Sequence, residues 1–120
     1  MGVVKVTARI GATSQDLHEV EFLVDTGSFY TILPPELCSR LELPFQQRER
    51  VVTADNRTMT IEIGSAHIEV DGRGAAILVG KMRVPAPLLE VSALEALGFK
   101  VNPVDEVLEP SRPFPEIPIL

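Results

Sequence analysis

The stretch FLVDTGSFYTILP, residues 22–34, places one carboxylate between two apolar runs. A carboxylate at the end of an apolar strand is costly to bury unless it is hydrogen-bonded or paired. Two interpretations are open: Asp25 belongs to an ordinary Asp-Thr-Gly turn, or it is held there for chemistry. In the second case Gly27 permits a tight turn, and the hydroxyls of Thr26 and Ser28 can hold the turn or orient the carboxylate. A held, partly desolvated carboxylate is a candidate general base.

Composition and charge narrow the class of protein. A chain of 120 residues, of which 45% are hydrophobic, suits one domain with a small core. The formal net charge of −6 argues against a nucleic-acid-binding protein, which needs a basic face to meet phosphates. The sequence shows no apolar stretch long enough for a membrane span, and its N-terminal residues suggest a strand rather than a signal peptide. We therefore expect a soluble cytoplasmic protein.

The sequence carries no recognisable metal or cofactor motif. Cys38 is the single cysteine, so it forms neither an internal disulfide nor a thiolate metal site. His18 and His67 have no ligand spacing with each other or with a group of carboxylates. We expect Cys38 to be a small buried residue on a short helix, and we expect no metal and no cofactor.

Strand patterns dominate the chain. Strands are predicted by alternating or continuous apolar residues at 4–10, 18–24, 29–33, 51–53, 58–63, 66–70 and 75–79. Turn residues separate them, among them Gly64-Ser65 and the segment 71–74. A proline pair predicts a helix at about 35–41, and a capping box of Ser92 and Glu95 predicts another at 92–97. The sequence therefore predicts an all-β domain with two short helices.

One carboxylate alone does not easily hydrolyse an amide. Attack by water needs a base to take the proton of the water and an acid to polarise the carbonyl. Two carboxylates that share one proton supply both, because like charges so close together cannot both ionise. A chain with a single Asp-Thr-Gly can obtain the second carboxylate by forming a homodimer, whose two-fold axis brings the Asp25 residues of both chains together.

The strand–DTGS–strand–helix order of residues 22–41 resembles the catalytic loop of the retropepsin-like aspartic proteases. A predicted hairpin at 51–61 occupies the place of the flap of that family. The segment ILVGKMRVPAPLLEVSALEALGFKVNP, residues 77–103, resembles the second half of a retroviral-type protease subunit and, more closely, of its small prokaryotic relatives. The resemblance covers residues 3–108. It implies an all-β, retropepsin-like acid-protease barrel with one lobe per chain.

The domain organisation follows from the same comparison. Residues 1–109 are expected to form the protease domain, and residues 110–120 a proline-rich C-terminal arm. From Pro103 onward, five prolines in 18 residues predict a tail without a folded element of its own. The apolar residues near its end are compatible with an arm that packs on the surface or with one that ties two subunits together.

The resemblance also implies roles for particular residues. Asp25 is expected to be the catalytic carboxylate, one per subunit. In the same loop Thr26 is expected to brace the two loops across the dimer axis, Gly27 to let the substrate backbone approach, and Ser28 to orient the carboxylate. The flap is expected to close over an extended peptide or protein substrate, with its tip at Ala54, Asp55, Asn56 and Arg57. Pocket walls are expected at Leu23, Val52, Val79 and Leu88.

Two features depart from the pattern of that family. Glu90 follows Leu88-Leu89 where the family has a glycine near the catalytic loop, and the flap tip lacks glycines. Three outcomes are open for a glutamate at this position. It clashes with the catalytic loop, it adds a third carboxylate that raises the pKa of the dyad, or it points to solvent.

Three functions therefore stay open. The first is an aspartic endopeptidase that activates water with an Asp25 dyad formed across a homodimer axis. The second is a catalytically inactive dimer of the same fold that acts as a peptide-binding or assembly module. The third, an unrelated β-barrel in which DTGS is only a turn, is disfavoured because three separate segments fall in the expected order.

Overall fold

The computed structural model describes residues 4–102 and 104–111. Within these residues the elements, in chain order, are β1 (Lys5–Gly11), β2 (His18–Asp25), β3 (Thr31–Leu33), α1 (Pro35–Arg40), β4 (Phe45–Val52), β5 (Thr58–Val70), β6 (Arg73–Lys81), β7 (Leu88–Glu90), α2 (Val91–Ala96), β8 (Phe99–Asn102) and β9 (Val107–Pro110). The predicted all-β fold with two short helices is confirmed, and each helix boundary lies within one residue of its predicted position.

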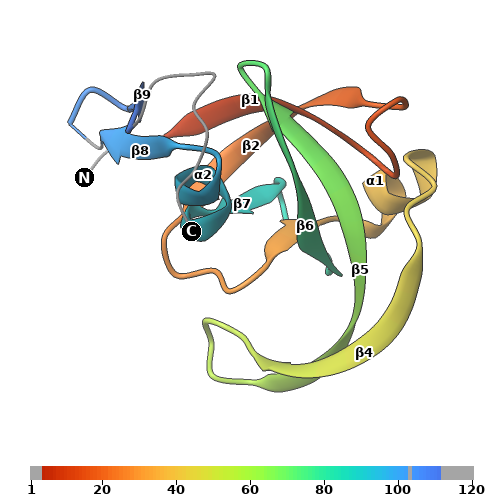
Figure 1. Ribbon diagram of the computed structural model, residues 1–120. Coiled ribbons are helices and arrows are strands. Elements are labelled where there is room, and N and C mark those ends of the chain that lie inside the picture. Colours follow the sequence, from red (N-terminus) through yellow and green to blue (C-terminus); the bar gives the residue numbers. More distant parts are fainter. Residues whose placement is uncertain (1–3, 103, 112–120) are drawn as a thin grey trace, which may run out of the picture.

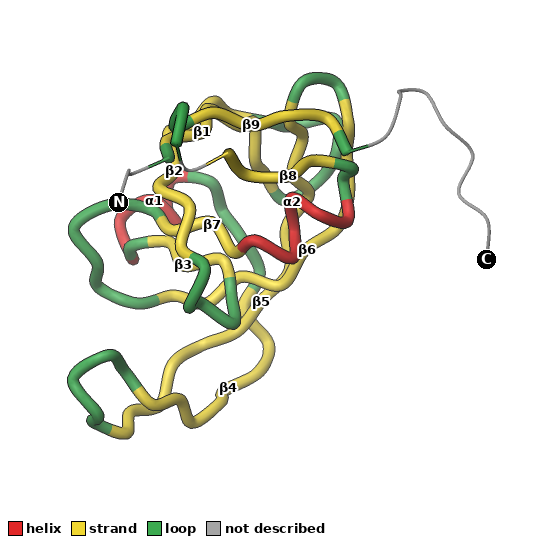
Figure 2. The backbone as a smooth tube through the Cα atoms, turned by 90° about the vertical axis from the view of Figure 1, so that its left-hand side faces the viewer, coloured by secondary structure: helices red, strands yellow, loops and turns green. Residues whose placement is uncertain are grey.

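Six strands close into a barrel. The order in the sheet is β1-β2-β7-β3-β6-β5-β4, and an additional pairing of β1 with β5 closes the ring and leaves β4 outside it. β7 lies between β2 and β3, parallel to the first and antiparallel to the second. In Figure 1 the β4–β5 hairpin extends below the barrel, and the quarter-turn view of Figure 2 shows the same projection. The ring brings the end of β2, which carries Asp25, next to β7.

The barrel interior holds one main apolar cluster. In β1 the residues Val6, Ala8 and Ile10 are buried, whereas the residues between them are exposed. This spacing of two is what a strand with one buried face requires. Phe22 of β2 and Ile68 of β5 are fully buried in the same cluster. The strands therefore present their apolar faces to a common interior.

Cys38 lies on α1 and is buried, as predicted. Its thiol is 3.7 Å from the carbonyl oxygen of Leu33. Burial raises the pKa of the Cys38 thiol to about 11. A thiol of this kind is protonated at neutral pH, so Cys38 behaves as a small core residue.

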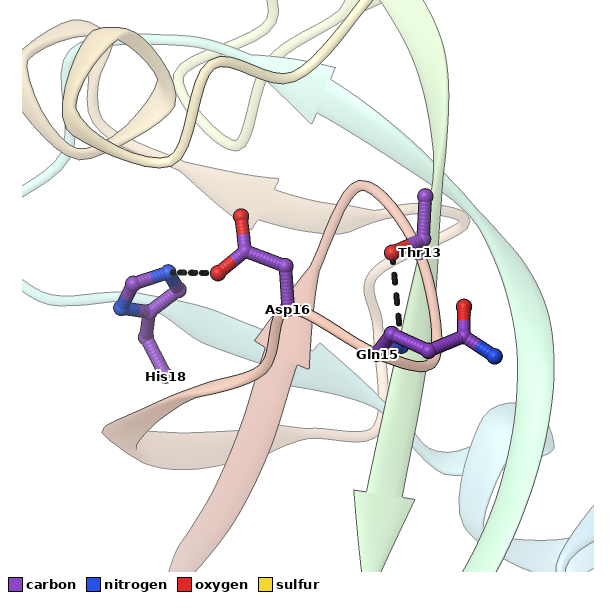
Figure 3. A network of polar contacts seen from close by, with 4 residues as sticks. All are labelled: Thr13, Gln15, Asp16 and His18. Atoms are coloured by element: carbon purple, nitrogen blue, oxygen red, sulfur yellow. Dashed lines mark hydrogen bonds and ion pairs between the residues drawn. The ribbon is translucent and has the colours of Figure 1, made fainter.

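The turn between β1 and β2 is held by short-range polar contacts (Figure 3). The backbone N–H of Gln15 donates to Thr13 Oγ1 at 3.3 Å, and His18 Nε2 lies 3.0 Å from Asp16 Oδ1. His18 is exposed at the start of β2. Its contact with Asp16 belongs to a local turn.

The structure contains no turn at Gly64-Ser65, so that prediction is wrong. β5 runs through both residues as one continuous strand. A Cβ atom at Gly64 would lie 2.0 Å from the carbonyl oxygen of Pro44. The register of β4 against β5 also shifts nearby, between Phe45 and Gln47. The glycine is needed for the close approach of a neighbouring segment rather than for a reversal of the chain.

The capping box at Ser92 is also wrong, although the helix is present. Glu90 is the N-cap residue of α2, with no side-chain capping bond, and Ser92 lies inside the first turn. The Ser92 hydroxyl donates instead to Glu90 Oε2 at 3.0 Å. At the other end Gly98 has a φ of 90°, and its N–H donates to the Glu95 carbonyl at 3.0 Å, as expected for a residue that ends a helix.

Residues 99–110 add a small two-stranded sheet of β8 and β9. The prediction of an unfolded tail from Pro103 is therefore wrong for residues 107–110. The Ser111 N–H also donates to the Gly98 carbonyl at 2.7 Å, which fixes this segment to the end of α2. The rest of the predicted arm, residues 112–120, lies outside the described residues. In the described part of the chain, no helix has the length and apolar character needed to cross a membrane.

Candidate active site

Asp25 is the last residue of β2, and the loop 26–30 connects it to β3. The side chain is partly buried. The backbone N–H of Gly27 donates to Asp25 Oδ1 at 2.9 Å, and the N–H of Ser28 lies 3.3 Å from the Asp25 carbonyl oxygen. The loop backbone therefore fixes the carboxylate at the edge of the barrel.

The hydroxyl of Ser28 does not hold the carboxylate. It donates to the carbonyl oxygen of Tyr30. Ser28 was expected to orient the Asp25 carboxylate. In the structure the Gly27 N–H, and not the Ser28 hydroxyl, donates to that carboxylate. Thr26 and Gly27 are exposed, so both are open to a substrate or to a second chain.

A cleft of about 600 Å³ separates this loop from the β4–β5 hairpin. Asp25, Gly27 and Ser28 line it on the loop side, together with Phe29 and Tyr30. Its other walls are Ile32, residues 50–54 of the hairpin, Ile61, Met82 and Leu88. Figure 1 shows the hairpin curving beneath the loop that follows β2. The cleft thus runs between the candidate carboxylate and the predicted flap.

The floor of the cleft is a second apolar cluster. Ile32, Ile61 and Ile63 are its buried members, and Val51 and Leu88 are among the partly buried residues that pack against it. Apolar walls exclude water from the neighbourhood of a carboxylate and strengthen its electrostatic interactions.

Gly80 permits the close packing of this floor. A Cβ atom at Gly80 would lie 2.9 Å from the Cδ1 atoms of both Ile32 and Ile61. A side chain at this position would therefore require Ile32 and Ile61, which line the cleft, to shift.

Only part of the predicted pocket wall lines this cleft. Val52 and Leu88 line it, and so does Ala54 of the flap tip. Val79 does not, because it is fully buried in the main core, beside its register partner Thr31. Leu23 is partly buried and lies outside the cleft. The structure therefore places neither Leu23 nor Val79 on the cleft wall.

The predicted flap tip is a turn closed by its own contacts. The Thr53 N–H donates to the Arg57 carbonyl at 2.8 Å, and the Asn56 N–H donates to the Thr53 carbonyl at 2.9 Å. Asn56 has a φ of 63°, a left-handed conformation that asparagine adopts more readily than most residues. The Asp55 carboxylate accepts a hydrogen bond from the Thr53 hydroxyl and forms an ion pair with Arg57, whose Nε lies 3.0 Å from Asp55 Oδ2. Asp55, Asn56 and Arg57 are exposed and do not line the cleft.

Glu90 is the register partner of Asp25 on the parallel neighbour β7. It nevertheless does not line the cleft that contains Asp25. Its side chain is partly buried in a separate hollow, next to Ser92. Burial raises the pKa of the Glu90 carboxyl, and the hydrogen bond from Ser92 acts in the opposite direction. Of the three expected outcomes for this glutamate, a direct obstruction of the cleft does not occur.

Sequence reasoning missed several residues of the cleft. Phe29 and Tyr30 follow the DTGS loop directly, so their place in the chain was a usable signal. Ile61 is the last residue of the predicted flap hairpin. Met82 had no such signal, because a hydrogen bond of its N–H to the distant Leu33 carbonyl brings it to the site. Arg50 also borders the cleft from the hairpin.

A closed barrel with an Asp-Thr-Gly loop, facing a hairpin across an apolar cleft, defines the single-lobed aspartic proteases as a class. The sequence profile of one family, described as aspartyl protease, matches residues 6–105. The chain belongs to this aspartyl protease family. Its predicted resemblance to the retropepsin-like proteases and its place among the hydrolases are thereby confirmed. A search of curated proteins gives no match.

Proposed function

We propose that the protein is an aspartic endopeptidase whose active form is a homodimer. The observation that carries the proposal is the Asp25 carboxylate, held by the Gly27 N–H at 2.9 Å and facing an apolar cleft. One chain supplies one such carboxylate, and the adjoining Thr26 and Gly27 are exposed. A two-fold axis beside this loop would pair the Asp25 residues of two chains.

The chemistry follows from a shared proton. One Asp25 carboxylate accepts a proton from water, while the protonated carboxyl of the second chain donates to the carbonyl oxygen of the peptide. The proton taken from water then passes from the Asp25 carboxyl to the amide nitrogen as the C–N bond breaks. The Gly27 bond engages Oδ1, and among the described residues no hydrogen bond to Oδ2 occurs. Oδ2 is therefore available to the water and to the partner carboxyl.

The substrate class follows from the shape of the cleft. Its walls are mostly apolar, and the β4–β5 hairpin borders one side. An extended peptide fits such a groove, because alternate side chains meet apolar walls while the backbone passes the carboxylates. Movement of the hairpin toward the loop would exclude water from the reacting bond.

The test is cleavage of a denatured mixed-sequence protein by wild type and by Asp25→Asn. Loss of the general base and acid predicts a fall in rate of about 10²–10⁴-fold. Asp16→Asn makes the same chemical change in an exposed turn and should cleave like wild type. Circular dichroism and sedimentation should show the same fold and oligomer for all three proteins. Undiminished cleavage by folded Asp25→Asn contradicts the proposal.

A second candidate function is a catalytically inactive dimer that binds peptides or assists assembly. The observation in its favour is Glu90, a further carboxylate in register with Asp25. A like charge nearby alters how readily a carboxylate pair shares a proton. Binding of a peptide without cleavage by wild type, together with cleavage by Glu90→Gly, would favour this candidate.

A further inference from the structure

A second hollow, of about 250 Å³, adjoins the cleft. Phe29 and Tyr30 line both cavities, so the two meet at the end of the Asp25 loop. Beyond them the hollow is bordered by residues 76–78 of β6 and by α2. Residues 29–30 therefore form the boundary between the two cavities.

The walls of the second hollow are apolar and open. The side chains of Phe29 and Leu78 are among them, and these residues are 81% and 52% exposed. Ala93 and Ala96 line it from α2. Exposed large apolar residues that border a cavity mark a place where a ligand chain can bury its own apolar surface.

One carboxylate lies in this apolar surrounding. Glu90 lines the hollow and receives the Ser92 hydroxyl at 3.0 Å. Ser92 is neutral, and among residues 4–102 and 104–111 no lysine or arginine forms an ion pair with Glu90. A partly buried carboxylate that has only one neutral donor gains free energy when a cation reaches it. The raised pKa of the Glu90 carboxyl agrees with this lack of compensation.

We propose that the second hollow binds the side chain of an arginine or lysine of a peptide whose backbone occupies the main cleft. The aliphatic stem packs on Phe29 and Leu78, and the cation pairs with the Glu90 carboxylate. Long basic side chains combine an apolar stem with a charged end, which matches the two parts of this hollow. This inference rests on the proposed function only in requiring that the cleft holds an extended peptide.

The experiment measures binding rather than cleavage. Asp25→Asn protein is titrated with a series of extended peptides. Each peptide derives from one parent peptide with uncharged side chains, and a single arginine replaces a different residue in each. Each peptide is compared with its citrulline counterpart, which has nearly the same shape without the charge. At one position we expect the arginine peptide to have a dissociation constant about tenfold lower than its citrulline counterpart. This is the effect of one hydrogen bond to a charged group. Glu90→Gln in the same background should reduce that preference to less than about twofold.

Glu95→Gln is the matched control. Glu95 lies on the same helix and is exposed, and it does not line the hollow. Its loss removes the same charge, so a general electrostatic effect would weaken arginine binding equally in both variants. We expect the arginine preference to survive in Glu95→Gln.

Three results would overturn the inference. They are an absence of arginine preference at every position, a preference that persists in folded Glu90→Gln, and an absence of peptide binding. These outcomes are separate from the failure of the proposed function, which is judged by cleavage with Asp25 intact. A protein that cleaves peptides without any preference for a basic residue would retain the function and lose the subsite.

Discussion

Asp25 and Glu90 are neighbours on two parallel strands, yet their surroundings differ. Asp25 accepts a backbone N–H from Gly27 and faces the main cleft. Glu90 accepts only the Ser92 hydroxyl among the described residues and lies in the second hollow. Two carboxylates in different environments can perform different tasks. In the proposed function Asp25 is the reacting group, and in the proposed subsite Glu90 recognises the ligand.

The raised pKa of Glu90 has a consequence for stability. The folded chain binds the proton of the Glu90 carboxyl more tightly than the unfolded chain does. The free energy of unfolding therefore falls as pH rises through and above the ordinary glutamate pKa of about 4.3. Glu90→Gln removes that dependence. We expect the stability of the variant relative to wild type to increase from about pH 3 to about pH 7, measured by urea unfolding at each pH. A constant difference across that range would contradict this prediction.

The site was predictable from sequence where it is local. The Asp25 loop and the turn at residues 54–57 depend on neighbouring residues, so patterns in the chain reveal them. The pocket wall depends on which strands pair and on which face each side chain points. Val79 was predicted as a wall residue, but its pleat position directs it to the main core. Phe29 was missed as a wall residue although it follows the loop directly.

At the scale of elements, Arg73 links the β5–β6 hairpin to the end of α2. The turn residues Asp71 and Gly72 have φ values of 48° and 80°, so the chain reverses and Arg73 begins β6. Arg73 is buried, and one guanidinium nitrogen donates to the carbonyls of Leu97 and Gly98 at 3.2 and 3.0 Å. The cation also lies 4.7 Å from the centre of the Phe99 ring. It thereby donates to the carbonyl of Leu97, the C-cap residue of α2, and shares the Gly98 carbonyl with the Ser111 N–H.

Replacement of Arg73 should loosen this junction. Arg73→Met keeps much of the apolar stem. It removes this donor from the Leu97 carbonyl and leaves the Gly98 carbonyl with the Ser111 N–H, which predicts a loss of about 1–3 kcal/mol in the free energy of unfolding. Arg83→Met is the control, because Arg83 is exposed and its contact with Glu36 spans 3.6 Å. That change should stay within about 0.5 kcal/mol. Urea unfolding of both variants checks the difference, and equal losses would contradict the role of Arg73.

The flap hairpin has its own local stability. Asn56→Val places a β-branched residue at a φ of 63°, at a cost of about 1–2 kcal/mol. Asn56→Gly relieves that restriction. Amide hydrogen exchange should show faster exchange at the Thr53 and Asn56 N–H groups in the valine variant, because these groups close the turn. The amide of Ile68 in the barrel should not change, and an equal change there would indicate global destabilisation.

Glycine and serine illustrate why element boundaries were harder to predict than elements. Gly64 and Ser92 have the residue types of a turn and of a helix cap. In the structure Gly64 admits the Pro44 carbonyl inside a continuous strand, and Ser92 donates to a side chain. Both uses depend on a neighbour brought there by the tertiary fold. The apolar periodicity that defines a strand or a helix is a property of the segment itself, and it was predictable.

For the whole molecule, the proposed dyad predicts that activity depends on pairs of chains. When Asp25→Asn is mixed with an equal amount of wild type and the chains exchange, about half of the wild-type chains pair with a variant chain. Those pairs lack one carboxylate, so activity per wild-type chain should fall to about half. It should fall further with excess variant. An equal mass of an unrelated folded protein serves as the control, and unchanged activity with the variant would contradict a dyad shared between chains.

The insertion of β7 between β2 and β3 has a consequence during synthesis of the protein on the ribosome. β2 and β3 are made early, but the strand that joins them follows β4, β5 and β6 in the chain. While residues 88–90 remain in the ribosomal exit tunnel, β2 has no parallel neighbour at the level of Asp25. The loop that carries the carboxylate is therefore framed only after β4, β5 and β6 have been made. The candidate active site therefore stays incomplete until residues 88–90 have left the tunnel.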